Sequence, residues 1–169
     1  MKRLIYIILG LMLGLSLQPV FAQAVNQPLT GQQFSGDFVI NAAPAKVWQV
    51  LTDAAQLTSI LGYEYLGGAR KFSQAGSEAQ VKAWGDASSF MLVRSVPYKE
   101  LRFNLDPENG SYICNCRWVL SPAGKDTRVR FEERYTESGP QTADALQAQV
   151  KETNEKFQRL KQRVENGLN

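Results

Sequence analysis

The sequence predicts an α+β domain in which a curved antiparallel sheet of about six or seven strands packs against one long C-terminal helix. Three observations lead to this prediction. Strand-like runs separated by short turn sequences fill the middle of the chain, two short helical patterns follow the first strand, and an amphipathic helical pattern occupies the C-terminal part. Because short connections favour antiparallel neighbours, the strands should form a meander.

The N-terminal residues have the layout of a cleavable secretory signal peptide. Two basic residues precede an apolar run at 4–17, and the small residues Val20 and Ala22 follow at the positions that signal peptidase recognises. The run is shorter than the roughly 20 residues that a transmembrane helix needs, which disfavours a retained membrane anchor. We expect cleavage after Ala22, with Ala24 as the alternative, and a mature protein that is periplasmic or secreted.

Beyond residue 22 the chain is nearly neutral. The sequence has 19 basic and 16 acidic residues, and residues 1–22 contain two of the basic and none of the acidic ones. The remaining 17 basic residues are interleaved with 16 acidic ones, which argues against nucleic-acid binding. The polar residues 23–33 are expected to be a flexible lead-in, and residues 34–165 a single domain.

Alternating apolar residues predict a first strand at 34–40. Pro44 can open a short helix that ends near Thr52, and Asp53 can cap a second one that Gly62 terminates. The later strands are predicted from alternation and turn residues at 63–72, 79–84, 89–96, 100–105, 112–120 and 127–135.

The C-terminal helix is predicted over residues 141–165, after Gly139 and Pro140. Its other faces carry charged residues, among them Lys156, and the pattern could also form a coiled-coil seam, although packing on the domain's own sheet fits it better. The apolar stripe consists of Leu146, Val150, Thr153, Phe157, Leu160 and Val164.

Two segments resemble one known family. Residues 38–53, FVINAAPAKVWQVLTD, are similar to the opening strand and helix of the START-like (SRPBCC) superfamily. Residues 118–135, WVLSPAGKDTRVRFEERY, resemble the closing strands of its polyketide cyclase/dehydrase and lipid-transport branch. The resemblance implies a helix-grip fold over about residues 34–165, with a cavity between the sheet and the long helix. Members of the superfamily include hormone binders, lipid-transfer domains and cyclases, so the resemblance leaves the activity open.

The chain has no histidine, which excludes Ser-His-Asp and Cys-His arrangements and histidine metal sites. No phosphate-binding glycine loop or dinucleotide fingerprint is present, so we expect no cofactor, and no metal site either. The candidate catalytic residues are Glu133 and Tyr135, which share a face of the last strand with Val129 and Phe131. An inward acid beside a tyrosine could move protons on a bound carbonyl compound. Alternatively, Glu133 lies in water or pairs with an arginine.

Cys114 and Cys116 share one face of a strand, where residues two apart are separated by roughly 6.6 Å at Cα. This distance is near the upper limit for a disulfide, so two buried free thiols are expected. Arg94 shares a parity with Phe90 and Leu92, but Met91 and Val93, of the opposite parity, are apolar as well, which leaves its direction open. The residues expected to line a ligand cavity are Trp84, Phe90, Arg94, Phe103, Cys116, Trp118, Phe131, Glu133, Val150 and Phe157.

An apolar cavity with few polar groups is typical of a small-molecule site. We therefore expect a periplasmic binding protein for a hydrophobic or amphipathic small molecule, such as a lipid, an isoprenoid or an aromatic metabolite. One alternative is a cyclase or dehydratase that uses Glu133 and Tyr135. Another is an envelope protein-interaction module whose cavity is collapsed by side chains.

Overall fold

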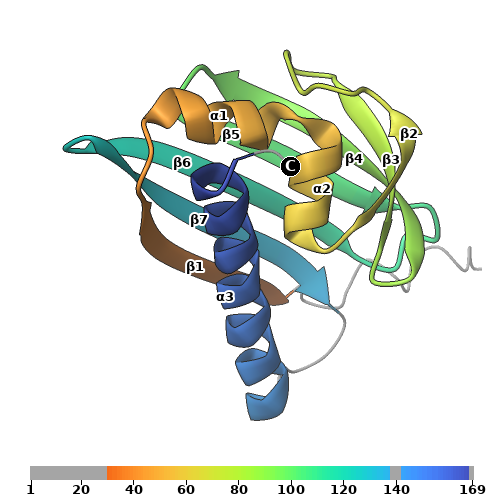
Figure 1. Cartoon of the computed structure of the whole chain (residues 1–169). Coiled ribbons are helices and arrows are strands. Elements are labelled where there is room, and N and C mark those ends of the chain that lie inside the picture. The colour runs from red at the N-terminus through yellow and green to blue at the C-terminus, as the bar shows by residue number, and fades with distance from the viewer. Residues whose placement is uncertain (1–29, 138–141, 168–169) are drawn as a thin grey trace, which may run out of the picture.

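The computed structural model describes residues 30–137 and 142–167, and in these residues three helices cover one face of a seven-stranded sheet (Figure 1). None of the helices in these residues is long and apolar enough to cross a membrane. In chain order the elements are β1 (Thr30–Ile40), α1 (Pro44–Thr52), α2 (Ala54–Leu61), β2 (Glu64–Gly68), β3 (Glu78–Ala83), β4 (Asp86–Val96), β5 (Glu100–Pro107), β6 (Ile113–Ala123), β7 (Asp126–Glu137) and α3 (Ala143–Glu165).

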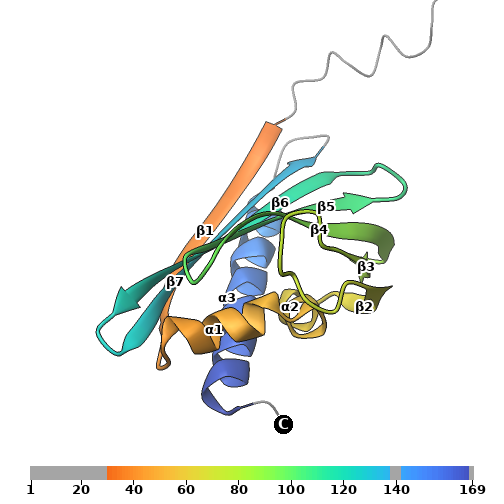
Figure 2. The same ribbon diagram turned by 90° about the horizontal axis from the view of Figure 1, so that it is seen from above.

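The sheet confirms the predicted antiparallel meander. Its strand order is β1-β7-β6-β5-β4-β3-β2, and every neighbouring pair is antiparallel. Because β1 and β2 lie at opposite edges, α1 and α2 carry the chain from one edge to the other. Viewed from above, all three helices lie on the same side of the sheet (Figure 2).

Local sequence signals set the ends of the two short helices as predicted. Pro44 begins α1, where its missing N–H is not needed. The carboxylate of Asp53 caps α2 by accepting a hydrogen bond of 3.0 Å from the backbone N–H of Gln56. Gly62 ends α2 with φ +83°, a left-handed conformation that favours glycine.

The two largest differences from the predicted element boundaries lie in β1 and β2. β1 begins at Thr30, so residues 30–33, which were expected in the flexible lead-in, belong to the sheet. β2 ends at Gly68 instead of continuing to Phe72, because the chain turns away from β3 after Gly68, where φ is +90°. The signal peptide, its cleavage site and Gly139-Pro140 lie outside the described residues.

Aromatic side chains fill the space between the sheet and the helices. Phe90 and Phe103 stack with ring centroids 4.7 Å apart, and Trp118 packs on Phe131 at 4.4 Å. All four side chains are completely buried. Since aromatic rings bury large apolar areas, this cluster is a major source of the domain's stability.

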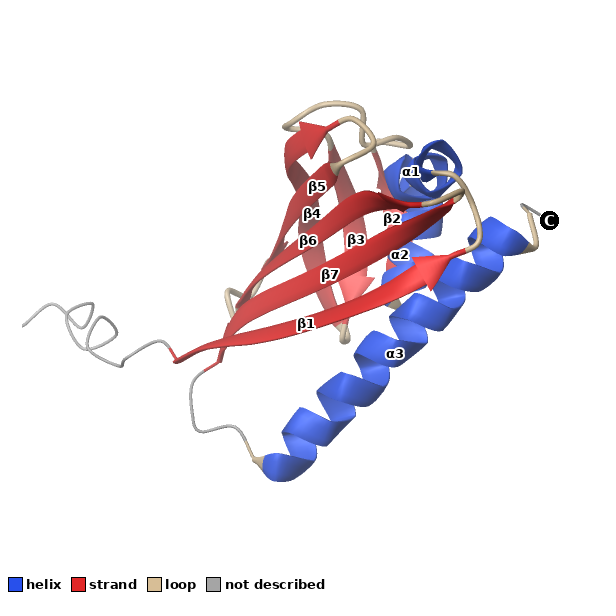
Figure 3. Cartoon of the chain, turned by 90° about the vertical axis from the view of Figure 1, so that its left-hand side faces the viewer, coloured by secondary structure: helices blue, strands red, loops and turns tan. Residues whose placement is uncertain are grey.

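α3 crosses the sheet obliquely and approaches β1 closely (Figure 3). The approach depends on Gly36, because a Cβ atom there would lie 2.5 Å from the ring of Phe157. That ring also packs on Phe38 with centroids 4.1 Å apart. The missing side chain at Gly36 therefore allows α3 to pack against the edge strand.

We expect Gly36→Ala to lower the free energy of unfolding by about 1–3 kcal/mol, because the added methyl group overpacks this contact. Urea denaturation measures the effect. Phe157→Leu provides the matched background, in which the same Gly36→Ala change should cost clearly less. Equal costs in the two backgrounds would show that the Phe157 ring is not the cause.

Candidate functional site

A buried ion pair joins the sheet to α3. Glu133 on β7 faces inward with 1% of its surface exposed, and Lys156 on α3 is completely buried. The Lys156 Nζ atom donates to both carboxylate oxygens of Glu133, at 2.9 Å to Oε2 and 3.2 Å to Oε1. The inward direction predicted for Glu133 is therefore correct, and its partner is a lysine from α3 and not an arginine.

A second carboxylate completes the cluster around Lys156. The Oε1 atom of Glu152, one helical turn earlier, lies 3.1 Å from Nζ, and Glu152 keeps 32% of its side chain exposed. The ammonium also lies 5.4 Å from the centre of the Phe131 ring. Burial opposes the charged form of Lys156, but the two carboxylates outweigh it and raise the pKa of the lysine. Lys156 is therefore protonated at neutral pH.

Two free thiols lie beside this pair, as predicted. Cys114 donates a weak hydrogen bond from Sγ to Glu133 Oε1 at 3.7 Å, and Cys116 lies directly opposite Glu133 in the strand register. Burial, assisted by the charge of Glu133, raises the pKa of both thiols. Since the thiolate is the reactive form, these cysteines are inert at neutral pH.

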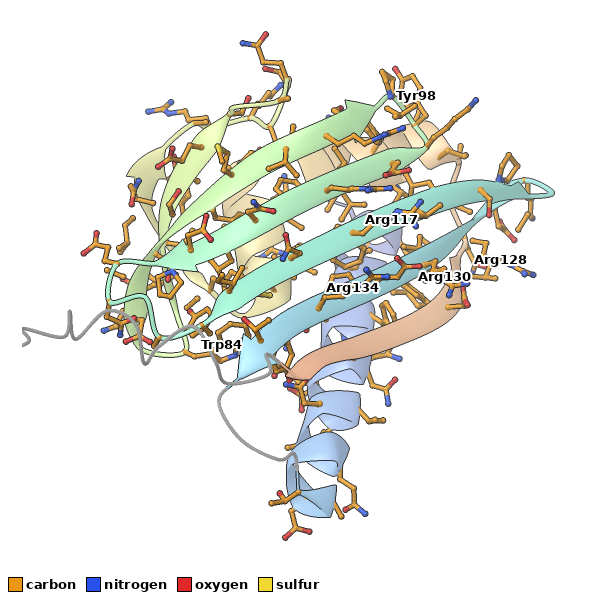
Figure 4. All side chains as sticks on the ribbon, turned by 180° about the vertical axis from the view of Figure 1, so that it is seen from behind. Trp84, Tyr98, Arg117, Arg128, Arg130 and Arg134 are labelled. Carbon is orange, nitrogen blue, oxygen red and sulfur yellow. The ribbon has the colours of Figure 1, made fainter. Side chains whose placement is uncertain are left out.

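Three aromatic side chains at one end of the domain form a cluster, called here the aromatic rim and defined as Tyr63, Trp84 and Tyr112. The Trp84 ring meets Tyr63 edge-on at 5.4 Å and Tyr112 at 5.3 Å. Trp84 is 48% exposed and has φ +49°, a conformation that costs a residue with a side chain about 1 kcal/mol. The turn between β3 and β4 thus holds a strained, half-exposed tryptophan at the end of the domain seen in Figure 4.

The inward-facing candidates meet in the interior of the domain. Phe90, Phe103, Trp118 and Phe131 have no accessible surface. A side chain that lined a void large enough for water would keep some accessible surface, so none of the four borders such a void. Cys116 and Phe157 are also buried, and ligand contact by these six residues stays a prediction.

Comparisons with known proteins show the fold. No family model and no curated protein matches the sequence. The structure of the Mll3558 protein from Rhizobium loti matches with a TM-score of 0.63 at 14% identity, over 80% of this chain and 98% of that one. Protein CV1439 from Chromobacterium violaceum gives 0.61 at 14% identity, over 79% and 96%. Ara h 8.0201 gives 0.58 at 15% identity, over 79% and 97%. The chain has a helix-grip fold, as predicted.

Three residues expected to line the cavity of the helix-grip fold lie elsewhere. Arg94 points out of the sheet with 57% of its side chain exposed, because an irregularity between Leu92 and Arg94 shifts the alternation of β4. Val150 is 52% exposed, since the first turns of α3 extend beyond the sheet in Figure 1. Trp84 was assigned to a strand and lies in the turn after β3.

The sequence reasoning missed Lys156 as a site residue. The buried face of α3 contains Thr153, Lys156, Phe157, Leu160 and Val164, so Lys156 belongs to the inner face and not to the solvent-exposed ones. The available signal was the position of Lys156 next to Phe157 and one turn after Thr153. A lysine there becomes an expected core residue only when an inward carboxylate on the sheet is recognised as its partner.

Two buried polar atoms near the pair lack hydrogen-bond partners within the part of the chain that the structure describes. These atoms are Nε1 of Trp118 and Oγ1 of Thr153. An unpaired buried donor or acceptor costs about 1–3 kcal/mol, so such atoms call for an explanation.

Glu133 and Tyr135 share the inward face of β7, as predicted for the catalytic alternative, and both are buried.

The buried groups predict loss of stability at alkaline pH. Burial raises the pKa of the two thiols above 9.0 and that of Tyr63 above 10.0, and the carboxylates raise that of Lys156 above 10.5. Each raised pKa contributes stability that is complete below the value of the unfolded chain and is lost as the pH rises. Urea denaturation between pH 7 and 11 should show the decline beginning near pH 9, where the unfolded thiols ionise.

The Cys116→Ala variant removes one of the two buried thiols that contribute to the loss of stability at alkaline pH. Its decline between pH 9 and 10 should be shallower than that of the unmodified protein, while both should fall above pH 10. A free energy of unfolding that stays constant to pH 11 would contradict the assignment of these groups to the interior.

Proposed function

We propose that this helix-grip domain is a binding protein for a hydrophobic or amphipathic small molecule whose polar group contacts the Glu133–Lys156 pair. The observation that carries the proposal is this buried ion pair in an otherwise apolar interior. Replacing a buried ion pair by apolar residues often leaves a fold equally stable, so stability alone gives a weak reason for its presence. Buried groups with a shifted pKa are enriched at functional sites, and the pKa of Lys156 is raised.

The unpaired atoms near the charge pair support the same site. Trp118 Nε1 can donate one hydrogen bond and Thr153 Oγ1 can donate or accept one, and neither has a partner in the described residues. A ligand hydroxyl or carbonyl group would supply the missing partners, while its apolar part would pack against Phe131 and its neighbours. The fold itself is compatible with hydrophobic ligand binding.

Ligand entry is proposed at the aromatic rim. Trp84 exposes apolar surface there, and α3 packs mainly on β1, α1 and α2 and makes few contacts with the centre of the sheet. Because the interior aromatics are closely packed, a ligand can enter only if α3 or the rings move. The strained conformation of Trp84 is consistent with a residue kept exposed for contact.

We also propose that the protein acts outside the cytoplasm, on the basis of the signal-like residues 1–22. Export followed by cleavage after Ala22 gives a mature protein whose first residue is Gln23. The intact mass of protein purified from the periplasm tests this, because cleavage after Ala24 or retention of the signal gives a different mass.

Native mass spectrometry of the same preparation tests ligand binding. A lipid-like species bound near one-to-one, released under denaturing conditions and identified, is the expected result. A protein that stays free of ligand after challenge with a lipid library would contradict the proposal.

One observation favours a second candidate, the envelope protein-interaction module. The four aromatic side chains at the centre of the interior border no void, as expected for a collapsed cavity. This candidate predicts a ligand-free protein that crosslinks to a specific envelope partner. The cyclase or dehydratase alternative has no comparable support, because Glu133 serves as the counterion of Lys156.

A further inference from the structure

The outer face of the sheet carries three arginines in one cross-strand row. Arg94 of β4 pairs in register with Arg102 of β5, which pairs with Arg117 of β6. Like charges directly opposite one another on neighbouring strands destabilise a sheet. Figure 4 shows Arg117 with further arginines of β7 on the same face.

The carboxylate of Glu100 contacts all three arginines of this row. Glu100 Oε1 lies 3.6 Å from Arg94 Nε and is hydrogen bonded to Arg102 Nε, while Oε2 lies 3.1 Å from an Nη atom of Arg117. Burial acts to raise the pKa of Glu100, but the hydrogen bonds from Arg117 and Arg102 outweigh it, and the pKa falls below its ordinary value. Glu132 also pairs with Arg117 and with Arg130, so four guanidinium groups surround these two carboxylates and leave an excess of positive charge.

A second row, two residues further along the strands, adds more donors. Asn104, Asn115 and Arg134 lie opposite one another on β5, β6 and β7. Arg134 is exposed and has no ion pair with any carboxylate in the described residues, and the buried Nε atom of Arg117 has no hydrogen-bond partner there. Each row therefore contains an arginine that can still donate to a ligand: Arg117 in the first row and Arg134 in the second.

A hollow of about 450 Å³ lies on this face, with residues of both rows in its lining. Phe103 and Cys116 also line it, and since their side chains face the core, their backbone forms the floor. Glu132 is the carboxylate in the lining, and it is already engaged by Arg117 at 3.3 Å and Arg130 at 3.0 Å. We call this hollow the outer arginine pocket, lined by Val93, Arg102, Phe103, Asn104, Asn115, Cys116, Arg117, Glu132 and Arg134.

We propose that the outer arginine pocket binds the phosphate or carboxylate group of an anionic ligand, held chiefly by Arg117 and Arg134. The planar guanidinium group presents paired N–H donors that match the oxygens of both anions. The asparagine amides can donate further hydrogen bonds. The site lies on the face opposite the Glu133–Lys156 pair and does not depend on the proposed interior ligand.

NMR titration of the mature chain with inorganic phosphate, and separately with citrate, tests the pocket. Shifts of the Arg117 and Arg134 side-chain N–H groups and of the Asn104 and Asn115 amides are expected. Arg134→Gln should weaken binding at least about tenfold, because a hydrogen-bonded charged contact is lost. Arg128→Gln, on the same exposed face of β7 but outside the pocket, is the matched control and should leave affinity unchanged. Absence of these shifts at millimolar anion, or equal losses in the two variants, would overturn the proposal.

Flotation with vesicles that contain phosphatidylglycerol distinguishes the source of the anion. Flotation that Arg134→Gln abolishes and soluble phosphate competes away identifies a lipid headgroup. Phosphate or citrate binding without flotation identifies a soluble anion. Failure in both experiments overturns the outer site and leaves the interior-ligand proposal unaffected, because native mass spectrometry tests that proposal separately.

Discussion

Lys156→Ala is expected to lower the free energy of unfolding by about 3–5 kcal/mol, because it leaves the carboxylate of Glu133 buried without its counterion. Glu152 cannot compensate, since it is itself an acid. Urea denaturation at pH 7 measures the change. Lys151→Ala, on an exposed face of the same helix, is the control and should alter stability by less than about 0.5 kcal/mol.

A small effect of Lys156→Ala would mean that Glu133 reaches water once the lysine is removed. In that case the pair would lie at the open end of the interior and not within a dry core. Glu152→Gln provides a graded comparison: as Glu152 is partly exposed, its loss should cost clearly less than the loss of Lys156.

The double replacement Glu133→Leu with Lys156→Met is expected to separate stability from function. Both charges are removed together, so the fold should be equally stable or more stable by about 1–4 kcal/mol. Ligand occupancy should fall at least about tenfold if the polar group of the ligand contacts this pair, because its charged hydrogen-bond partners are gone. Urea denaturation and native mass spectrometry measure the two quantities on the same preparation.

Unchanged occupancy in a stable double variant would show that the pair does not contact the ligand. Reduced stability in the double variant would show instead that the pair is needed for the packing of α3. Either outcome is informative because the single Lys156→Ala variant establishes independently what an unpaired Glu133 costs.

Much of the helix-grip architecture follows from local sequence signals. The alternation of Val129, Phe131 and Glu133 assigned the inward face of β7 correctly, since successive side chains on a strand point to opposite sides. The capping by Asp53 and the termination at Gly62 were also predictable, because caps depend on a few adjacent residues. The spacing of Cys114 and Cys116, two residues apart on one strand, was enough to predict free thiols.

The incorrect predictions concern residues whose direction depends on contacts between distant parts of the chain. Alternation on β4 could not place Arg94, because the irregularity after Leu92 reverses the direction of the following side chains. The polarity of Lys156 suggested a solvent-exposed face, whereas its partner Glu133 lies 23 positions earlier in the chain. Val150 fitted the apolar stripe of α3 but is exposed, because the sheet does not extend beneath that turn.

The sequence by itself determined the class of fold, the order of the elements and the inward direction of Glu133, because periodicity, caps and turns are local properties of the chain. Only the tertiary structure decided that Lys156 neutralises Glu133, that the Phe131 ring lies beside the lysine and that three arginines meet on the outer face. These features depend on strand register and on the rotation of α3, which are set by packing between distant segments.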